Sequence, residues 1–427
     1  MRIARPTYLR SGRLPSLAVA LAAAVAAVLA GCGGSGGKHG AHGILTIYAS
    51  LPRHGLPGVT ANAVAAGAHL ALADAGGRAG GRRVRLVPLD STAPGADTWD
   101  PGTVEANARR ASDDQSAVAY LGELDTGGSA ISIPVTSSTG LLQLSPLDGL
   151  SVLTHPDPTN PAEGPARYYS NGRRTFLRLV PPDFLQADAL VRWARDAGAR
   201  SIAIVRDDRL SGRALARETG DAAARLRIPV TDIEEARHGA PDYTSLAHDL
   251  AAKPAEAVIY TGLGGVSADR LLAAVSRALP HAAVYAGVGI DSGGAVPSVK
   301  PVDALERVGP ESVYGAVARS VLRRLRAERG GASVPVQALY GYEAMRLILE
   351  AIDAAGNHGG ERAAVLRAAL RPRVRRSPLG TYSITASGDA APARFASYRL
   401  FAGSGQYLGL RGPSGPLSRG LASRRRR

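Results

Sequence analysis

Short apolar runs alternate along the chain with longer stretches in which apolar residues recur at helical spacing. Between residues 44 and 144 this pattern predicts strands at 44–49, 83–89, 117–121 and 141–144, and helices at 62–74, 104–113 and 126–140. Strands and helices that alternate in this way form a parallel sheet with helices on both of its faces.

A second series of the same kind follows a proline-containing stretch at 147–174. Its expected strands are 201–205, 257–260 and 283–286, and its expected helices are 184–197, 213–226, 243–252 and 267–279. Further helices are expected at 311–329 and 336–355, and short strands with turns at 379–410. The pattern therefore predicts an α/β protein with two similar lobes.

The first residues have the features of an export signal. Four arginines precede an alanine-rich apolar run at 17–29, which is too short to cross about 30 Å of hydrocarbon as a helix. Small residues follow, so residues 1–31 are expected to be a cleaved signal peptide. The segment Leu29-Ala30-Gly31-Cys32 resembles a bacterial lipobox, which implies that Cys32 is lipidated and that residues 32–43 form a glycine-rich tether. The alternative is an ordinary signal peptide with an incidental cysteine.

The net charge of +15 is concentrated at the two ends of the chain. The leader holds four arginines and segment 411–427 holds six, neither with an acidic residue, which leaves +5 between them. That middle part has no basic stripe interleaved with aromatic residues, so nucleic-acid binding is not expected. Segment 411–427 is expected either to be a disordered solvated tail or to bind anionic lipid or cell-wall polymers. The single cysteine excludes an internal disulfide and a cysteine-based zinc site.

Five stretches together resemble the type I periplasmic binding protein family, in the leucine/isoleucine/valine-binding branch of ABC-transporter substrate receptors. They are Ser50-Leu51-Pro52, the glycine-rich turn 75–84, the paired loops 122–129 and 144–148, Phe176-Leu177-Arg178 with Asp183 and Gln186, and Tyr340-Gly341-Tyr342-Glu343-Ala344. Each stretch is short, and their order and spacing carry the resemblance, which extends from residue 44 to about residue 410.

The resemblance implies two Rossmann-like lobes with parallel central sheets, joined by a hinge in which the chain crosses three times. We place the crossings near 171–176, 301–311 and 371–378. The first lobe then comprises residues 44–173 and 311–371, the second comprises 174–310 and 372–410, and 411–427 form the basic tail.

Candidate ligand-binding residues follow the strands of the first lobe, because ligands of open α/β sheets bind outside the carboxyl ends of the strands. Glycines in the loop at 122–129 allow close approach of the backbone, and a helix N-terminus offers free N–H groups. In the family these loops bind a carboxylate through hydroxyls and backbone amides. Thr126 has helix capping as an equally good explanation. The first-lobe candidates are Ser50, Asp125, Thr126, Gly127, Ser145, Leu147 and Asp148.

The second-lobe candidates are Ser211, Leu263 and Asp291. The family usually has an aromatic residue where Ser211 stands, and the loop around Leu263 has none beyond the strand end, which argues against a standard branched-chain amino acid. Asp291 stands where amino-acid binders place an acid for the α-ammonium group, although capping of the following turn explains it as well. With Asp125 and Asp148 in the pocket, a ligand with a cationic or hydrogen-donating part is conceivable.

No catalytic motif accompanies these loops: from residue 44 onward the chain has no G-x-S-x-G elbow, H-E-x-x-H helix or P-loop, so neither an enzyme nor a cofactor is expected. The favoured function is a lipid-anchored solute-binding protein on the extracytoplasmic face of the membrane, which passes an amino acid or related polar compound to an ABC permease. A ligand sensor of the same fold, signalling to a membrane partner, is the alternative. A secreted hydrolase is the third hypothesis, without a nucleophile–base pair to support it.

Overall fold

The computed structural model describes residues 43–95, 98–157, 160–290, 299–307 and 309–416. One compact unit starts at Ile44. Cys32, Asp291 and the last 11 residues, 417–427, lie outside the described residues. No helix in the described ranges is long and apolar enough to cross a membrane.

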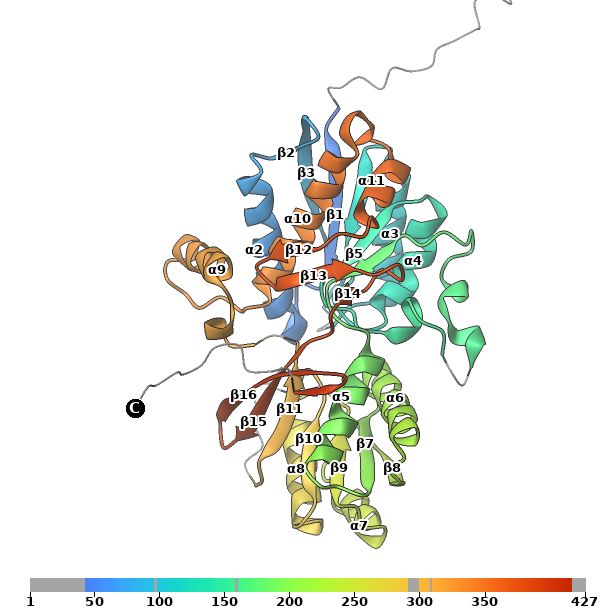
Figure 1. The fold of residues 1–427 in the computed structure, drawn as a ribbon, viewed down its shortest axis with the longest axis vertical. Coiled ribbons are helices and arrows are strands. Elements are labelled where there is room, and N and C mark those ends of the chain that lie inside the picture. The colour runs from blue at the N-terminus through green and yellow to red at the C-terminus, as the bar shows by residue number, and fades with distance from the viewer. Residues whose placement is uncertain (1–42, 96–97, 158–159, 291–298, 308, 417–427) are drawn as a thin grey trace, which may run out of the picture. The chain divides into compact units, whose positions relative to one another are not determined.

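The first lobe is built on a six-stranded sheet with the strand order β2-β3-β1-β4-β5-β6 (Figure 1). All neighbouring strands are parallel except β2 and β3. The central strands β1 and β4 are buried along their whole length, as expected for a sheet covered on both faces. The bounds are β1 (Leu45–Leu51), β2 (Arg78–Ala79), β3 (Arg82–Asp90), β4 (Ala117–Leu121), β5 (Leu142–Ser145) and β6 (Phe176–Arg178).

Helices cover both faces of this sheet. Ile47 and Ala49 belong to the core that contains α2 and α10, whereas Tyr48 between them belongs to the core that contains α3, because successive strand residues point to opposite faces. The helices of this lobe are α2 (Gly55–Asp74), α3 (Pro101–Asp113), α4 (Gly128–Ser138), α9 (Ala316–Glu328), α10 (Ala338–Ala354) and α11 (Arg362–Ala369).

Helices α2 and α10 lie side by side, and two glycines set their separation (Figure 1). A Cβ atom on Gly67 would lie 1.9 Å from the carbonyl oxygen of Ala338, and one on Gly341 would lie 1.8 Å from that of Val64. Any side chain at either position would push the helices apart. Gly341 of the Tyr-Gly-Tyr-Glu-Ala stretch is therefore explained by helix packing.

The second lobe is built on an eight-stranded sheet with the order β17-β16-β15-β11-β10-β9-β7-β8. Strands β11, β10, β9, β7 and β8 are parallel, and the β15–β17 meander adds to them in antiparallel fashion. Helices α5 and α6 pack on one face, and α7 and α8 on the other. The bounds are β7 (Ile202–Asp207), β8 (Val230–Ala236), β9 (Ala257–Tyr260), β10 (Ala283–Ala286), β11 (Val302–Glu306), β15 (Phe395–Phe401), β16 (Ser404–Gly412), β17 (Gly415–Pro416), α5 (Asp183–Asp196), α6 (Leu210–Leu226), α7 (Thr244–Ala252) and α8 (Val266–Ala278).

The chain passes between the two sheets after β6, after β11 and after β14. The α/β class with two Rossmann-like lobes is confirmed. The last passage differs from the expected one near 371–378, because a small sheet of β12 (Arg375–Ser377), β13 (Gly380–Ile384) and β14 (Ala390–Ala391) precedes it. Tyr382 and Ile384 of that sheet lie in the core of the first lobe, so residues 375–391 pack there rather than on the second lobe.

Other boundaries also shift by a few residues. Strand β6, at 176–178, belongs to the first sheet although the second lobe was expected to begin at 174. Strand β16 continues to Gly412 and is followed by β17, so the second sheet includes the start of the expected tail. Both changes concern strands at the edge of a sheet. An edge strand joins its sheet through backbone hydrogen bonds, so its residue types are a weak guide to its position.

Candidate functional site

The loop after β4 turns sharply at Gly122, whose φ is 147° and whose added Cβ atom would lie 2.6 Å from the carbonyl oxygen of Ser50. The turn brings Glu123 against β1 and β4. Its Oε2 accepts a hydrogen bond from the Ser50 hydroxyl at 3.0 Å, and its Oε1 accepts one from the Tyr120 hydroxyl at 2.5 Å. Burial raises the pKa of Glu123 to about 8, with the charges of Asp148 and Asp125 adding to the effect and the two hydroxyls opposing it. Glu123 is therefore mostly protonated at neutral pH, and its two hydrogen bonds hold the loop against β1 and β4.

Asp148, in the loop after β5, is fully buried. Its carboxylate accepts hydrogen bonds from the backbone N–H of Ser129 at 3.3 Å and from that of Leu150 at 3.0 Å. Its own N–H donates to the Ser145 hydroxyl at 2.9 Å, and that hydroxyl donates to the carbonyl of Glu123 at 2.5 Å. Burial raises the pKa of Asp148, against the lowering effect of these N–H groups. The loops after β4 and β5 thus form one connected polar unit.

Asp125 lies in the same unit with a free acceptor. Its Oδ2 is buried and, among the described residues, has no hydrogen-bond partner. Burial and the charge of Asp148 raise the pKa of Asp125 to about 6, while the charge of Arg307 lowers it. The carboxyl group is consequently mostly ionised at neutral pH, and its oxygen can accept a hydrogen bond from a group outside the chain.

Residues of both lobes converge at Gly149. The guanidinium of Arg307, which follows β11, donates to Asp183 at the start of α5 at 3.0 Å. A Cβ atom on Gly149 would lie 2.4 Å from the Arg307 Nη2 and 2.3 Å from the Asp183 Oδ1. The backbone N–H of Asp183 donates to the Gly149 carbonyl at 2.8 Å. Gly149 is the residue that lets this ion pair approach the first-lobe loops.

In the second lobe, Asp207 at the end of β7 organises two loops. Its Oδ2 accepts from the backbone N–H of Leu263 at 3.1 Å and from the Arg209 guanidinium at 3.3 Å. The Tyr260 hydroxyl donates to the Leu263 carbonyl at 2.9 Å. Ser211 is half-buried in the first turn of α6, beside these loops in the sequence. The loops after β7 and β9 are therefore held together.

The two lobes touch at the N-terminal end of α6. Gly127, with φ at 100°, precedes α4, and a Cβ atom there would lie 2.5 Å from the Leu210 Cδ2 and 3.7 Å from the Trp99 ring. Further along α6, the Arg217 guanidinium lies 2.8 Å from the Asp157 carboxylate of the long first-lobe loop. The loops at the carboxyl ends of the two sheets thus face each other. A solute that contacts candidate residues of both lobes would need this arrangement.

The expected site residues of the first lobe divide into two groups. Asp125, Thr126 and Gly127 lie on the first-lobe loop next to Leu210, and Asp148 lies behind them. Ser50, Ser145 and Leu147 are buried, and their contacts are within the lobe. The N-cap residue of α4 is Gly127, so Thr126 does not occupy the capping position. Asp291 lies outside the described residues.

Three charged or polar residues of this region were not among the sequence candidates. Glu123 accepts from Ser50, Asp183 donates its N–H to the Gly149 carbonyl, and Arg307 donates to Asp183. A buried position for Glu123 has a sequence signal, since apolar and small residues surround it in the loop. Asp183 and Arg307 are separated by 124 residues, and nothing in their local sequence links them.

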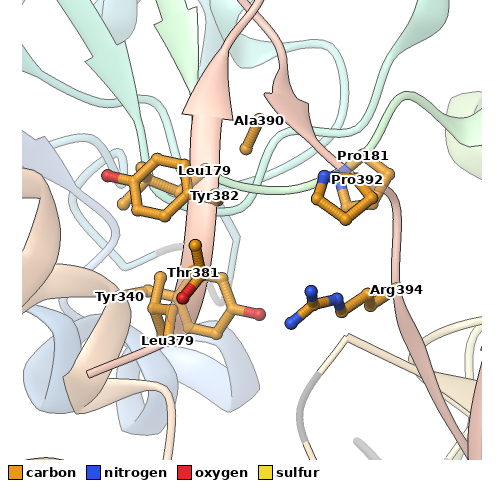
Figure 2. Close-up of a pocket in the computed structure, with 9 residues that line it drawn as sticks. All are labelled: Leu179, Pro181, Tyr340, Leu379, Thr381, Tyr382, Ala390, Pro392 and Arg394. Carbon is orange, nitrogen blue, oxygen red and sulfur yellow. The ribbon is translucent and has the colours of Figure 1, made fainter. Parts of the chain in front are cut away.

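A separate hollow lies where the chain passes between the lobes (Figure 2). The hydroxyl of Tyr340 donates to the carbonyl of Arg307 at 2.8 Å, and that of Tyr382 donates to buried Glu343 at 2.7 Å. The two tyrosine hydroxyls are thus already used within the chain, which makes the hollow a weaker candidate than the facing loops. Its lining residues are Leu179, Pro181, Tyr340, Leu379, Thr381, Tyr382, Ala390, Pro392 and Arg394.

Solved structures with the same architecture come from several bacteria. The leucine-binding protein LivK of Thermotoga maritima has a TM-score of 0.68 and 20% identity, covering 86% of this chain and 98% of that one. An ABC-transporter solute-binding protein of R. palustris in complex with benzoate has a TM-score of 0.68 and 16% identity, covering 88% and 97%. A substrate-binding protein of Sphaerobacter thermophilus has a TM-score of 0.69 and 18% identity, covering 88% and 100%. At these identities the structures establish the fold.

Comparison by sequence gives the family. No curated protein sequence matches the chain significantly. A family model described as periplasmic binding protein matches residues 46–403, which is most of the chain and includes both lobes and all three passages between them. The order of motifs and the two-sheet architecture agree with that match, and the chain belongs to the periplasmic binding protein family.

Proposed function

We propose that this chain is an extracytoplasmic solute-binding protein that encloses a small molecule between its lobes and delivers it to an ABC permease. The observation that carries the proposal is that the loops at the carboxyl ends of the two sheets meet, with Leu210 against Gly127. Two residues before Gly127, the Asp125 Oδ2 is buried and has no partner among the described residues. Ligands of open α/β sheets bind at this end of the strands. Family membership supports the same location for the solute, between the two lobes.

The solute we propose is an amino acid or a related polar compound. The similar solved proteins include a leucine-binding protein and one in complex with benzoate, so small organic acids of this size are the appropriate starting set. For the first-lobe loop we propose contacts through Asp125, Thr126 and Gly127. For the second lobe we propose contacts through Ser211 and Leu263, whose loops are held together by Asp207.

Delivery to a permease requires the protein to stay at the membrane surface, and we propose that Cys32 provides the anchor. It is the single cysteine of the chain, so incorporation of a labelled fatty acid reports on one site. Cells that express the wild type should yield labelled protein in the membrane fraction, and a Cys32→Ser variant should be unlabelled and released. Labelling of the Cys32→Ser variant would refute the anchor without touching the solute-binding proposal.

Calorimetric titration of the purified full chain with the proteinogenic amino acids and small aromatic acids tests solute binding. We expect saturable binding with a stoichiometry near one, and a smaller radius of gyration by X-ray scattering when the solute is bound. A solute at about 100 times its Kd stabilises the folded state by about 2.7 kcal/mol, which a thermal-shift screen detects first. Saturable binding without any change in radius would show that the lobes do not close.

A further inference from the structure

Helix α4 begins at the first-lobe loop, and its N-terminus is already occupied by an anion from the chain. The backbone N–H of Ser129, in the first turn of the helix, donates to the Asp148 Oδ2 at 3.3 Å. The other carboxylate oxygen accepts from Leu150 at 3.0 Å, and Asp148 has no exposed surface. Helix N-termini attract anions because their N–H groups are free and the helix dipole is positive there. Asp148 therefore occupies the position that a solute carboxylate would otherwise take.

The same loop holds a second carboxylate, that of Asp125, close in sequence to its contact with the other lobe. Asp125 Oδ2 is buried without a partner among the described residues. Gly127, two residues later, contacts Leu210 of the second lobe. A buried carboxylate oxygen that lacks a partner is costly, and a cation that donates a hydrogen bond to it removes most of that cost.

The nearby cations of the chain are committed elsewhere. Arg307 donates to Asp183 at 3.0 Å, and Arg178 donates to Asp389 at 2.6 Å. Each arginine thus donates to a carboxylate other than those of Asp125 and Asp148, although the charge of Arg307 lowers the pKa of Asp125 and that of Arg178 lowers the pKa of Asp148. Among the described residues, no arginine is hydrogen-bonded to either of these two carboxylates.

We propose that the first lobe selects a cationic group of the solute, such as an ammonium, amidinium or guanidinium group, which binds at Asp125, and that Asp148 excludes a solute carboxylate from the α4 N-terminus. This inference rests on the proposed solute-binding function. It names Asp125 as the residue that binds the cation and Asp148 as the residue that sets specificity against anions.

Matched pairs of small molecules with opposite charge test the proposal. Calorimetry and thermal shift of the purified full chain compare benzamidine with benzoate and 3-methylbutylamine with 4-methylpentanoate, with leucine as a zwitterion. We expect the wild type to bind the cation of each pair at least tenfold more tightly than the acid. Asp125→Asn should weaken cation binding at least tenfold, and Asp148→Asn should strengthen acid binding at least tenfold. Asp249→Asn, at an exposed position of α7, is the control.

The outcomes separate this inference from the function on which it rests. Two results would overturn the inference and leave solute binding intact. In the first, the wild type binds the acid of a pair as tightly as the cation. In the second, Asp125→Asn changes the affinity for leucine or for the amine by less than twofold. If no probe binds, a co-purified compound with a basic nitrogen supports the inference and a purely anionic one overturns it. If no probe binds and no compound co-purifies, the solute-binding function itself fails, and the inference with it. Should Asp148→Asn not fold, Asp125→Asn alone decides.

Discussion

The guanidinium of Arg217 lies 2.8 Å from the carboxylate of Asp157, and this ion pair joins α6 of the second lobe to the long loop that follows β5 in the first. Asp157 is almost completely buried, whereas Arg217 is partly exposed. The pair therefore links the two lobes directly across their contact. We expect it to favour the closed form.

Loss of this ion pair should weaken solute binding while the fold stays intact. Arg217→Ala should lower affinity several-fold, and a double-mutant cycle with Asp157→Asn should give a coupling free energy of about 1 kcal/mol. The matched control is Arg225→Ala, which breaks a 2.8 Å pair with Asp188 within the second lobe and should leave affinity unchanged. Equal effects of the two arginine variants on affinity would show that the interlobe pair has no special part in closure.

Close packing of α2 on α10 makes Gly341 the more sensitive of two helical glycines. Gly341→Ala places a methyl group against the Val64 carbonyl and should destabilise the protein by about 3 kcal/mol or more. Gly220→Ala, in α6 with no atom near its added Cβ, should instead stabilise by about 0.5–1 kcal/mol through helix propensity. Urea denaturation measures both. A Gly341→Ala variant as stable as the wild type would contradict the observed helix separation.

The pKa of buried Glu123 predicts how stability changes with pH. Burial raises this pKa from 4.5 to about 8, so between these values the folded state holds a proton that the unfolded state has lost. The contribution of Glu123 is full below pH 4.5 and falls as the pH rises toward 8, by at most about 1.4 kcal/mol per pH unit.

Glu123→Gln should flatten this part of the stability profile, because the amide does not ionise. Urea unfolding between pH 5 and pH 9 should show the difference, with Glu328→Gln, at an exposed position of α9, as the control. If the wild type and Glu123→Gln keep parallel profiles over that range, the assigned protonation state of Glu123 is wrong.

Trp99 offers a fluorescence signal for solute binding. The protein has two tryptophans, and Trp99 lies near Gly127 and Leu210 at the contact between the lobes, whereas Trp193 is buried in the second lobe with the Arg411 guanidinium 3.9 Å from its ring centre. Addition of a solute should change Trp99 emission, and the change should persist in Trp193→Phe and disappear in Trp99→Phe. A change that follows Trp193 instead would place the solute away from the facing loops.

Much of the fold follows from hydrophobic periodicity. Strand β4 has the expected bounds of 117–121, and β9 and β10 match their expected ranges, because buried parallel strands are continuous apolar runs. Strand β8 was not expected, since it lies at a sheet edge and reads Val-Thr-Asp-Ile-Glu-Glu-Ala with polar residues throughout. Strand β11 falls in the expected hinge passage at 301–311, although its Val302, Ala304 and Leu305 are fully buried.

The candidate site is predictable only in part. Asp125 and Asp148 were predictable because each lies in a loop directly after a strand of the first lobe. The structure places both in one polar unit with Glu123. The contacts that distinguish the two aspartates are not readable from sequence. Asp148 meets the N–H of Ser129 across 19 residues, and Arg307 meets Asp183 across 124. Such pairings depend on how each lobe folds, because they join residues far apart in the sequence, and local composition does not encode them.

Mass spectrometry of small molecules released from the purified full chain tests most directly whether the facing loops hold a solute. We expect one dominant compound at close to one equivalent per chain, and its loss from protein that carries Asp125→Asn. Release of nothing from the wild type, together with the absence of any binding in the calorimetric panel, would contradict the proposed enclosure of a small molecule between the lobes.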